Sequence, residues 1–303
     1  MKKIKLLLFA SVMIAGIISI QSCQSTKTTT AAKMLKFNFE KGKGYDYEMT
    51  SSMDQEVMGQ DIQMDMTAYY SMVVNEDNGT TKTITSTIDR FKMKMGAMGF
   101  NLDIDTDKPM PGMGLTDDGK DPVKMMNTIF SAIKGQKFVM KVDAEGKVQE
   151  VTGFEDMANT IVDSLATDED NKAELKQKFS QQFNGEQMKS QFERAWYIFP
   201  NKEVKVGDSW DKNTEVPGEM GGSYKSTYKV TDIEGDMVTL AESTTIVSQQ
   251  KDMDMSGTIK GTLVVDSRLG LVVTADQDMK MKMGKDGKSV EMKMKNKIKG
   301  KAR

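Results

Sequence analysis

The chain has 303 residues, a formal net charge of −2 and 28 methionines, but it contains no histidine and only one cysteine. Histidine is the commonest general base near neutral pH and the commonest metal ligand, so most hydrolytic and metal-dependent chemistries are disfavoured. The small net charge gives no reason to expect a nucleic-acid partner. We therefore predict a protein that is not an enzyme and uses neither a cofactor nor a metal ion.

The N-terminal residues have the features of an export signal. Three lysines within the first five residues precede an apolar run from Leu6 to Ile20, which is too short to span a membrane as a helix. Gln21, Ser22 and Cys23 follow this run. A small residue directly before such a cysteine resembles the lipobox of bacterial lipoproteins, in which the position of Gln21 usually holds a small or branched residue.

This resemblance implies that residues 1–22 form a signal peptide and that Cys23 is acylated and anchors the protein to a membrane. Residues 23–34 are mostly small and polar, which predicts a flexible tether. Similar lipoproteins that stay in the inner membrane often have an aspartate next to the cysteine, and surface-exported ones often have an acidic cluster. Neither feature occurs here, so we expect an outer-membrane lipoprotein that faces the periplasm.

Residues 35–107 are predicted to form antiparallel strands. Apolar and polar side chains alternate there with a period of two, which is typical of strands with one wet face and one covered face. The cluster from Asn75 to Gly79 predicts a turn between two of these strands. Prolines and glycines then interrupt the pattern in residues 108–119 and predict a loop.

The middle segment, residues 121–197, changes to the period of a helix. Asp121 and Pro122 form a typical helix start. Helices are predicted at 121–135, 154–165, 170–183 and 186–197, and a hairpin is predicted at 137–151. This segment therefore separates two strand-rich parts of the chain.

Residues 203–299 return to alternating strands, with turn signals at 234–236, 267–269 and 285–288. The sequence therefore predicts an α+β fold, in which antiparallel β meanders form a curved sheet and the helical middle packs on it. We expect residues 35–303 to form a single domain.

Gly207-Asp208-Ser209 resembles the nucleophile block of GDS-type esterases. Such a serine needs a histidine to accept its proton, and the chain has none. We predict instead a turn that leads into a strand, with Trp210 as a core anchor and no catalytic residue.

The methionines near the C-terminus give the strongest functional signal. In the predicted hairpin, lysines alternate with methionines, so the lysines face water and the methionines share the other face. These methionines are Met279, Met281, Met283, Met292 and Met294. We expect helices from residues 121–197 to cover this face. Three interpretations stay open: a methionine-rich core, a surface that binds a lipid or another apolar ligand, and a site for the soft metals Cu(I) or Ag(I).

The block that runs from Phe199-Pro200 to Gly207-Asp208-Ser209-Trp210, together with the signal and the strand–helix–strand order, resembles an uncharacterised family of Bacteroidota lipoproteins. The order of elements is also similar to that of the β folds that carry lipoproteins across the periplasm. These resemblances imply a non-enzymatic envelope lipoprotein that binds an apolar ligand or lipid. The alternative is a structural or assembly protein that binds another envelope protein through its sheet.

Overall fold

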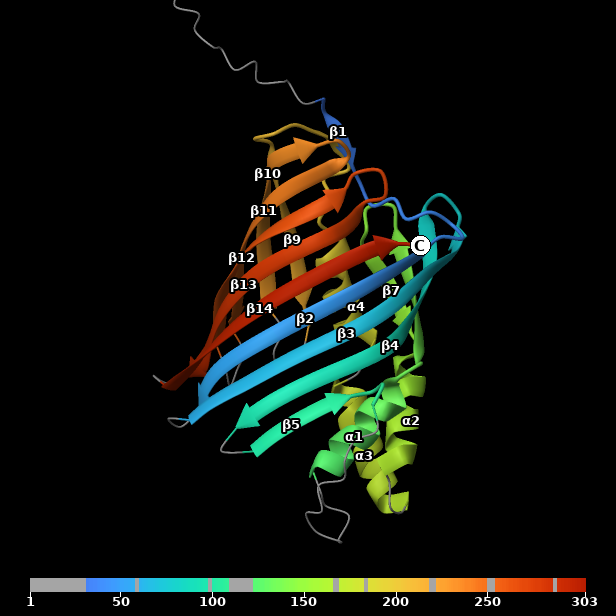
Figure 1. The fold of residues 1–303 in the computed structure, drawn as a ribbon, viewed down its shortest axis with the longest axis vertical. Coiled ribbons are helices and arrows are strands. Elements are labelled where there is room, and N and C mark those ends of the chain that lie inside the picture. The colour runs from blue at the N-terminus through green and yellow to red at the C-terminus, as the bar shows by residue number, and fades with distance from the viewer. Residues whose placement is uncertain are drawn as a thin grey trace, which may run out of the picture.

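The chain forms two strand-rich blocks around a helical middle segment (Figure 1). The computed structural model describes residues 31–57, 60–97, 100–108, 122–165, 169–182, 185–217, 222–249, 254–285 and 288–303. The predicted signal peptide, Cys23 and most of the predicted tether lie outside these residues. Within them the predicted fold class is confirmed, because antiparallel strands dominate and the helices belong to the middle segment.

The elements follow the predicted order. The N-terminal block contains β1 (Lys33–Leu35), β2 (Gly44–Val57), β3 (Gln60–Asp77), β4 (Thr81–Ala97) and β5 (Phe100–Asp105). The middle segment contains α1 (Pro122–Ile133), β6 (Lys137–Asp143), β7 (Val148–Thr152), α2 (Phe154–Leu165), α3 (Glu169–Gln182) and α4 (Gly185–Trp196). The C-terminal block contains β8 (Lys202–Val204), β9 (Ser209–Val216), β10 (Gly222–Glu234), β11 (Met237–Gln249), β12 (Asp254–Asp266), β13 (Leu271–Lys285) and β14 (Lys288–Ala302).

Twelve strands form one open antiparallel sheet in the order β7-β6-β4-β3-β2-β14-β13-β12-β11-β10-β9, with β5 paired to the second half of β4. The pairing of β14 with β2 joins the two strand blocks in the middle of this sheet. β1 and β8 form a separate pair. Strands twist relative to their neighbours, so a sheet of this width curls. Figure 1 shows the resulting curved wall, with β9 and α4 lying behind β14 and β2.

Helix α4 lies across the open side of the curved sheet. It contacts β7 and β9, which are the two edge strands. Met188, Phe192 and Trp196 recur on one side of this helix and pack against the core, as expected for an amphipathic helix. In the described parts of the chain, no helix has the length and apolar character that a membrane crossing requires.

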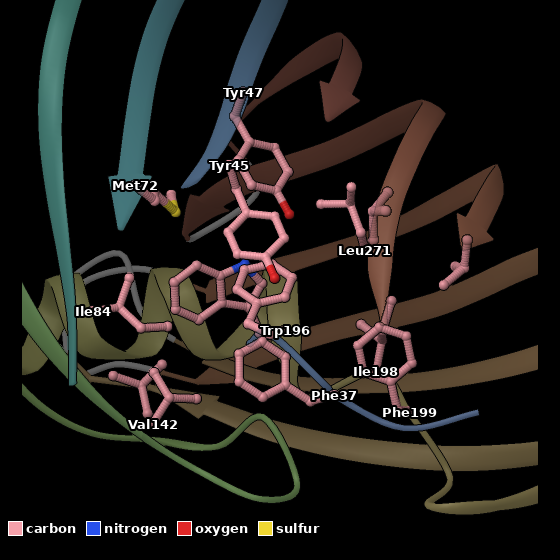
Figure 2. Packing of buried hydrophobic residues seen from close by; sticks show 14 of the residues in the cluster. Phe37, Tyr45, Tyr47, Met72, Ile84, Val142, Trp196, Ile198, Phe199 and Leu271 are labelled. Carbon is pink, nitrogen blue, oxygen red and sulfur yellow. The ribbon is translucent and has the colours of Figure 1, made fainter. Parts of the chain in front are cut away.

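An aromatic cluster around Trp196 fills one part of the space between α4 and the sheet. Trp196 is 4% exposed, and its ring centroid lies 5.8 Å from that of Phe37 and 6.0 Å from that of Phe39. Phe39 in turn stacks on Tyr45 of β2 at 4.0 Å. Figure 2 shows Trp196 among Tyr45, Tyr47 and Phe37. These contacts hold the C-terminal end of α4 against β2 and the segment that precedes it.

The block around Ser209 forms a turn and a strand, as predicted. The amide of Lys205 donates a hydrogen bond to Asp208 Oδ2 at 2.9 Å, and β9 begins at Ser209. Trp210 is half-buried against the core, and its indole N–H donates to the carbonyl oxygen of Ile198 at 2.7 Å. This bond ties the edge strand β9 to the residues that follow α4.

Candidate functional site

A cavity of about 410 Å³ lies between the inner face of the curved sheet and helix α4. Its lining comes from α4, from strands β9 to β14 and from β2, β3 and β4. Pockets that bind small molecules in proteins usually measure about 300–1,000 Å³, so this cavity is large enough for a ligand. The curvature of the sheet is what brings side chains from so many strands around one space.

A row of methionines crosses the inner face of the sheet beside this cavity. Met279 of β13 lies opposite Met294 of β14, which lies opposite Met53 of β2. The row continues through Met64 of β3 to Met95 of β4. Residues directly opposite each other in a sheet share a face, so these five side chains point to the same side. Five neighbouring strands therefore present a continuous thioether surface.

The five methionines that the sequence singles out lie together, but their burial differs. Met281 lies opposite Met292, and Met283 lies opposite Val290, on the same face as Met279 and Met294. Met279 is 6% exposed, whereas the other four are half-buried. Met279 and Met294 line the cavity. Met281, Met283 and Met292 continue this face toward the β13–β14 hairpin.

The expectation that helices from residues 121–197 cover this methionine face is met only at Met279 and Met294, which α4 faces across the cavity. Met279 packs in a cluster with Tyr224, Ile246, Met255 and Ile259, which come from β10, β11 and β12. In a strongly curved sheet, the inner side chains of successive strands turn toward each other, so the sheet covers its own face. The described part of α1 instead packs farther along the sheet, where the Phe130 and Phe91 rings stack at 4.3 Å.

A polar network lies within the cavity wall. Glu242 of β11 is 7% exposed, and both of its carboxylate oxygens accept hydrogen bonds. The Thr244 hydroxyl donates to one at 2.9 Å, and the Gln277 side-chain amide donates to the other at 2.5 Å. The Thr244 and Ser226 hydroxyls are also joined, at 2.7 Å. A buried charge is tolerated when its hydrogen bonds are made, as they are here.

Two cations lie on the same wall, each over an aromatic ring. Lys212 Nζ lies 3.7 Å from the centroid of Tyr197, and Arg194 Cζ lies 4.1 Å from the centroid of Tyr224. Among the residues that the structure describes, neither cation forms an ion pair with a carboxylate. Burial lowers the pKa of Lys212, and the charge of Glu145 acts in the opposite direction. Cation–π contacts hold both groups in position, and the carboxylates of Glu145 and Asp143 also act on Lys212.

A hydroxyl group in the lining has no partner. The Ser51 Oγ is buried and makes no hydrogen bond within the described protein. Ser51 lies on β2 opposite Asn296 and Met66, and all three residues line the cavity. A buried hydroxyl without a hydrogen bond is costly. The cavity therefore combines an apolar wall with polar groups that could bind a ligand.

Sequence reasoning missed most of these polar residues. Period two sets Glu242 and Thr244 on the same strand face as the apolar Leu240 and Ile246, and this interruption of an apolar face was a usable signal. Period two likewise sets Lys212 on the face of Trp210, but no local signal marks Arg194, because its role depends on α4 approaching β10. Within the described residues, no group of three or more acidic, histidine or cysteine side chains could hold a metal ion. The suggested soft-metal site stays a prediction.

Comparison with known proteins gives a family and a fold. Residues 79–272, well over half of the chain, match a family of unknown function (DUF6263). No curated protein matches the chain significantly. This confirms the prediction of an uncharacterised family. That its members are Bacteroidota lipoproteins, and that the fold is similar to lipoprotein carriers, stay predictions.

Two solved structures illustrate how far the similarity of the fold extends. A structure of lipovitellin, described as showing lipid–protein interactions, is similar with a TM-score of 0.50 and 10% identity. The match covers 88% of this chain and 26% of that chain, so this chain spans about a quarter of its length. Such low identity shows the fold alone. The translocator domain of the autotransporter NalP from Neisseria meningitidis matches at 6% identity over 86% of this chain and 89% of its own, but a TM-score of 0.24 supports no inference.

Proposed function

We propose a function from the geometry of the site, because the chain belongs to the family of unknown function DUF6263. The proposal is that the cavity binds a lipid or another apolar ligand without chemical conversion. The observation that carries it is the cavity of about 410 Å³ between the curved sheet and α4, beside an inner row of methionines that crosses five strands.

Two further points support this proposal. Methionine side chains are flexible and polarizable, so they adapt to apolar ligands of different shape. The similar fold in lipovitellin belongs to a structure described by its lipid–protein interactions, and we extend that association to this chain as part of the proposal. A large curved sheet with a covered inner face suits a ligand that must be kept away from water.

The proposed setting is the periplasmic side of the outer membrane, where a lipid on Cys23 holds the protein. The support is the apolar signal followed by the one cysteine of the chain. An anchored protein with an apolar cavity could hold or pass on a lipid near the membrane. Membrane attachment and ligand binding rest on different residues, so they can be tested separately.

We expect Cys23→Ala to move the protein from the membrane fraction to the soluble fraction of its host. Acyl chains supply membrane affinity in proportion to their buried CH2 groups, at about 0.8 kcal/mol each, and the variant cannot carry them. Fractionation followed by immunoblotting measures the shift, with Ser22→Ala as the matched control. A Cys23→Ala protein that stays in the membrane as firmly as wild type would contradict the anchor.

We expect Ala68→Trp to reduce binding of the neutral apolar dye N-phenyl-1-naphthylamine by about tenfold or more, since loss of roughly 1.4 kcal/mol already gives that factor. Ala68 lies between Met49 and Phe91 on the inner face and lines the cavity, so an indole there occupies the ligand space. Dye fluorescence during titration measures the effect, and circular dichroism checks the fold.

Lys295→Trp is the matched control. Lys295 is exposed on the outer face of β14, so this substitution adds the same indole ring outside the cavity. It should leave dye binding unchanged. Ser51→Phe blocks the same cavity from β2 and serves if Ala68→Trp does not fold. Undiminished dye binding by a folded blocking variant would show that the cavity is not the binding site.

A further inference from the structure

We infer that the ligand is an amphiphile with an acyl chain and an anionic headgroup, and that the headgroup binds between Lys212 and Arg194. This inference rests on the proposed function and adds the chemical class and the orientation of the ligand. It follows from how polar and apolar side chains are distributed around the cavity.

The cationic side of the cavity is formed by α4, β9 and β10. Lys212 lies opposite Ser226, and Thr214 lies opposite Tyr224, whose ring holds Arg194. The two cations therefore lie at neighbouring cross-strand pairs of β9 and β10, in the same wall of the cavity. The Thr214 hydroxyl lines the cavity at the same positions, whereas the Ser226 hydroxyl is already hydrogen-bonded to that of Thr244. Cations and hydroxyl donors together are the groups that bind carboxylates and phosphates.

The charge balance of the lining favours an anion. Among its described residues, the charged groups are Arg194, Lys212, Lys297 and Glu242. Lys297 pairs with Asp276 at 3.6 Å, and both oxygens of Glu242 already accept hydrogen bonds from protein. Counting Glu242 as a carboxylate, Arg194 and Lys212 leave the lining with one net positive charge, while Glu145 and Asp143, outside the lining, also act on Lys212. An anionic headgroup between the two cations would balance this charge and favour the charged form of Lys212.

The opposite side of the cavity suits an acyl chain. Met49, Met66 and Phe91 line it from β2, β3 and β4, and Met279 and Met294 line it from β13 and β14. The inner face continues from Met279 to the half-buried Met281 and Met283, toward the β13–β14 hairpin. A chain whose headgroup lies at β9 and β10 can therefore extend along methionines. The unpartnered hydroxyl of Ser51 lies on this methionine side, on β2 opposite Met66 and Asn296, and could bind a polar atom of the ligand.

The test compares cis-parinaric acid with its methyl ester, because the ester has the same acyl chain but a headgroup without charge. At pH 7.5 we expect the purified protein to bind the acid about tenfold more tightly, the effect of one charge-assisted hydrogen bond. Lys212→Met and Arg194→Met should each lose most of this preference while they keep the affinity for the ester. Lys229→Met, an exposed residue of β10, is the control and should keep the preference.

The possible outcomes distinguish the inference of an anionic headgroup from the proposed function of binding an apolar ligand. Equal binding of acid and ester by wild type, or preference unchanged in both cavity variants, would overturn the anionic headgroup but leave the proposed function. Binding of neither probe would overturn both. Lysophosphatidic acid should displace the bound probe. This result would show that the site also binds amphiphiles with a phosphate headgroup. Inorganic phosphate or acetate that competes equally well would show a simple anion site and overturn the amphiphile.

Discussion

Replacing Trp196 by alanine is expected to lower the free energy of unfolding by about 3–5 kcal/mol, the range for removing a large buried aromatic side chain. Trp196 is the last residue of α4, is 4% exposed and contacts the rings of Phe37, Phe39 and Phe192. Its removal opens a void where α4 meets the sheet. Because α4 contacts both edge strands, the loss should weaken closure of the whole curved sheet.

Urea or guanidinium unfolding followed by circular dichroism measures this loss. Trp210→Ala is the comparison, since Trp210 is only half-buried and lies at the edge strand β9. It should cost clearly less than Trp196→Ala, and part of its cost should come from the lost hydrogen bond to Ile198. Equal losses for the two variants would contradict a central role of Trp196.

Met279→Asp is expected to lower the free energy of unfolding by roughly 2–5 kcal/mol, because it introduces a short charged group into an apolar cluster. Met279 is 6% exposed and packs against Ile246 and Ile259. An aspartate side chain is too short to extend its charge into water, as a lysine can. Glu242 lies on the same face and would add repulsion rather than a partner.

Met281→Asp makes the same chemical change two residues along the strand, where the side chain is half-buried. It should cost markedly less stability, because the carboxylate can stay partly hydrated. Thermal melts of both variants test the difference. If Met281→Asp lowered the stability as much as Met279→Asp, this would contradict the description of Met281 as half-buried and of Met279 as part of the core. If both were harmless, no part of that face would belong to the core.

Much of the fold could be predicted because period two and period 3.6 are local properties of the sequence. The predicted turn at 234–236 corresponds to the hairpin in which Glu234 of β10 pairs with Met237 of β11. The predicted helix 186–197 corresponds to α4 within one residue at each end. Lysine and methionine alternation also predicted that the hairpin methionines share one face, and the structure places Met279 opposite Met294 and Met281 opposite Met292 on that face.

The neighbours of each strand and the cover of each face could not be predicted in this way. Alternation fixes which side chains share a face, but not that β14 pairs with β2 or that the sheet curls enough to cover Met279. The cavity arises from that curvature and from α4 crossing to β9. Arg194 lies on helix α4 and Lys212 on strand β9, and the two residues line the same cavity only because of this packing.

The central claim, that the cavity holds an acyl-chain ligand, is tested most directly by native mass spectrometry of the protein purified from its own host. Wild type should carry a mass excess that corresponds to one non-covalent lipid with an anionic headgroup, released on collisional activation. Ala68→Trp should lack this excess, while Lys295→Trp should retain it. Wild-type protein without any bound lipid, or a lipid retained equally by Ala68→Trp, would contradict the account.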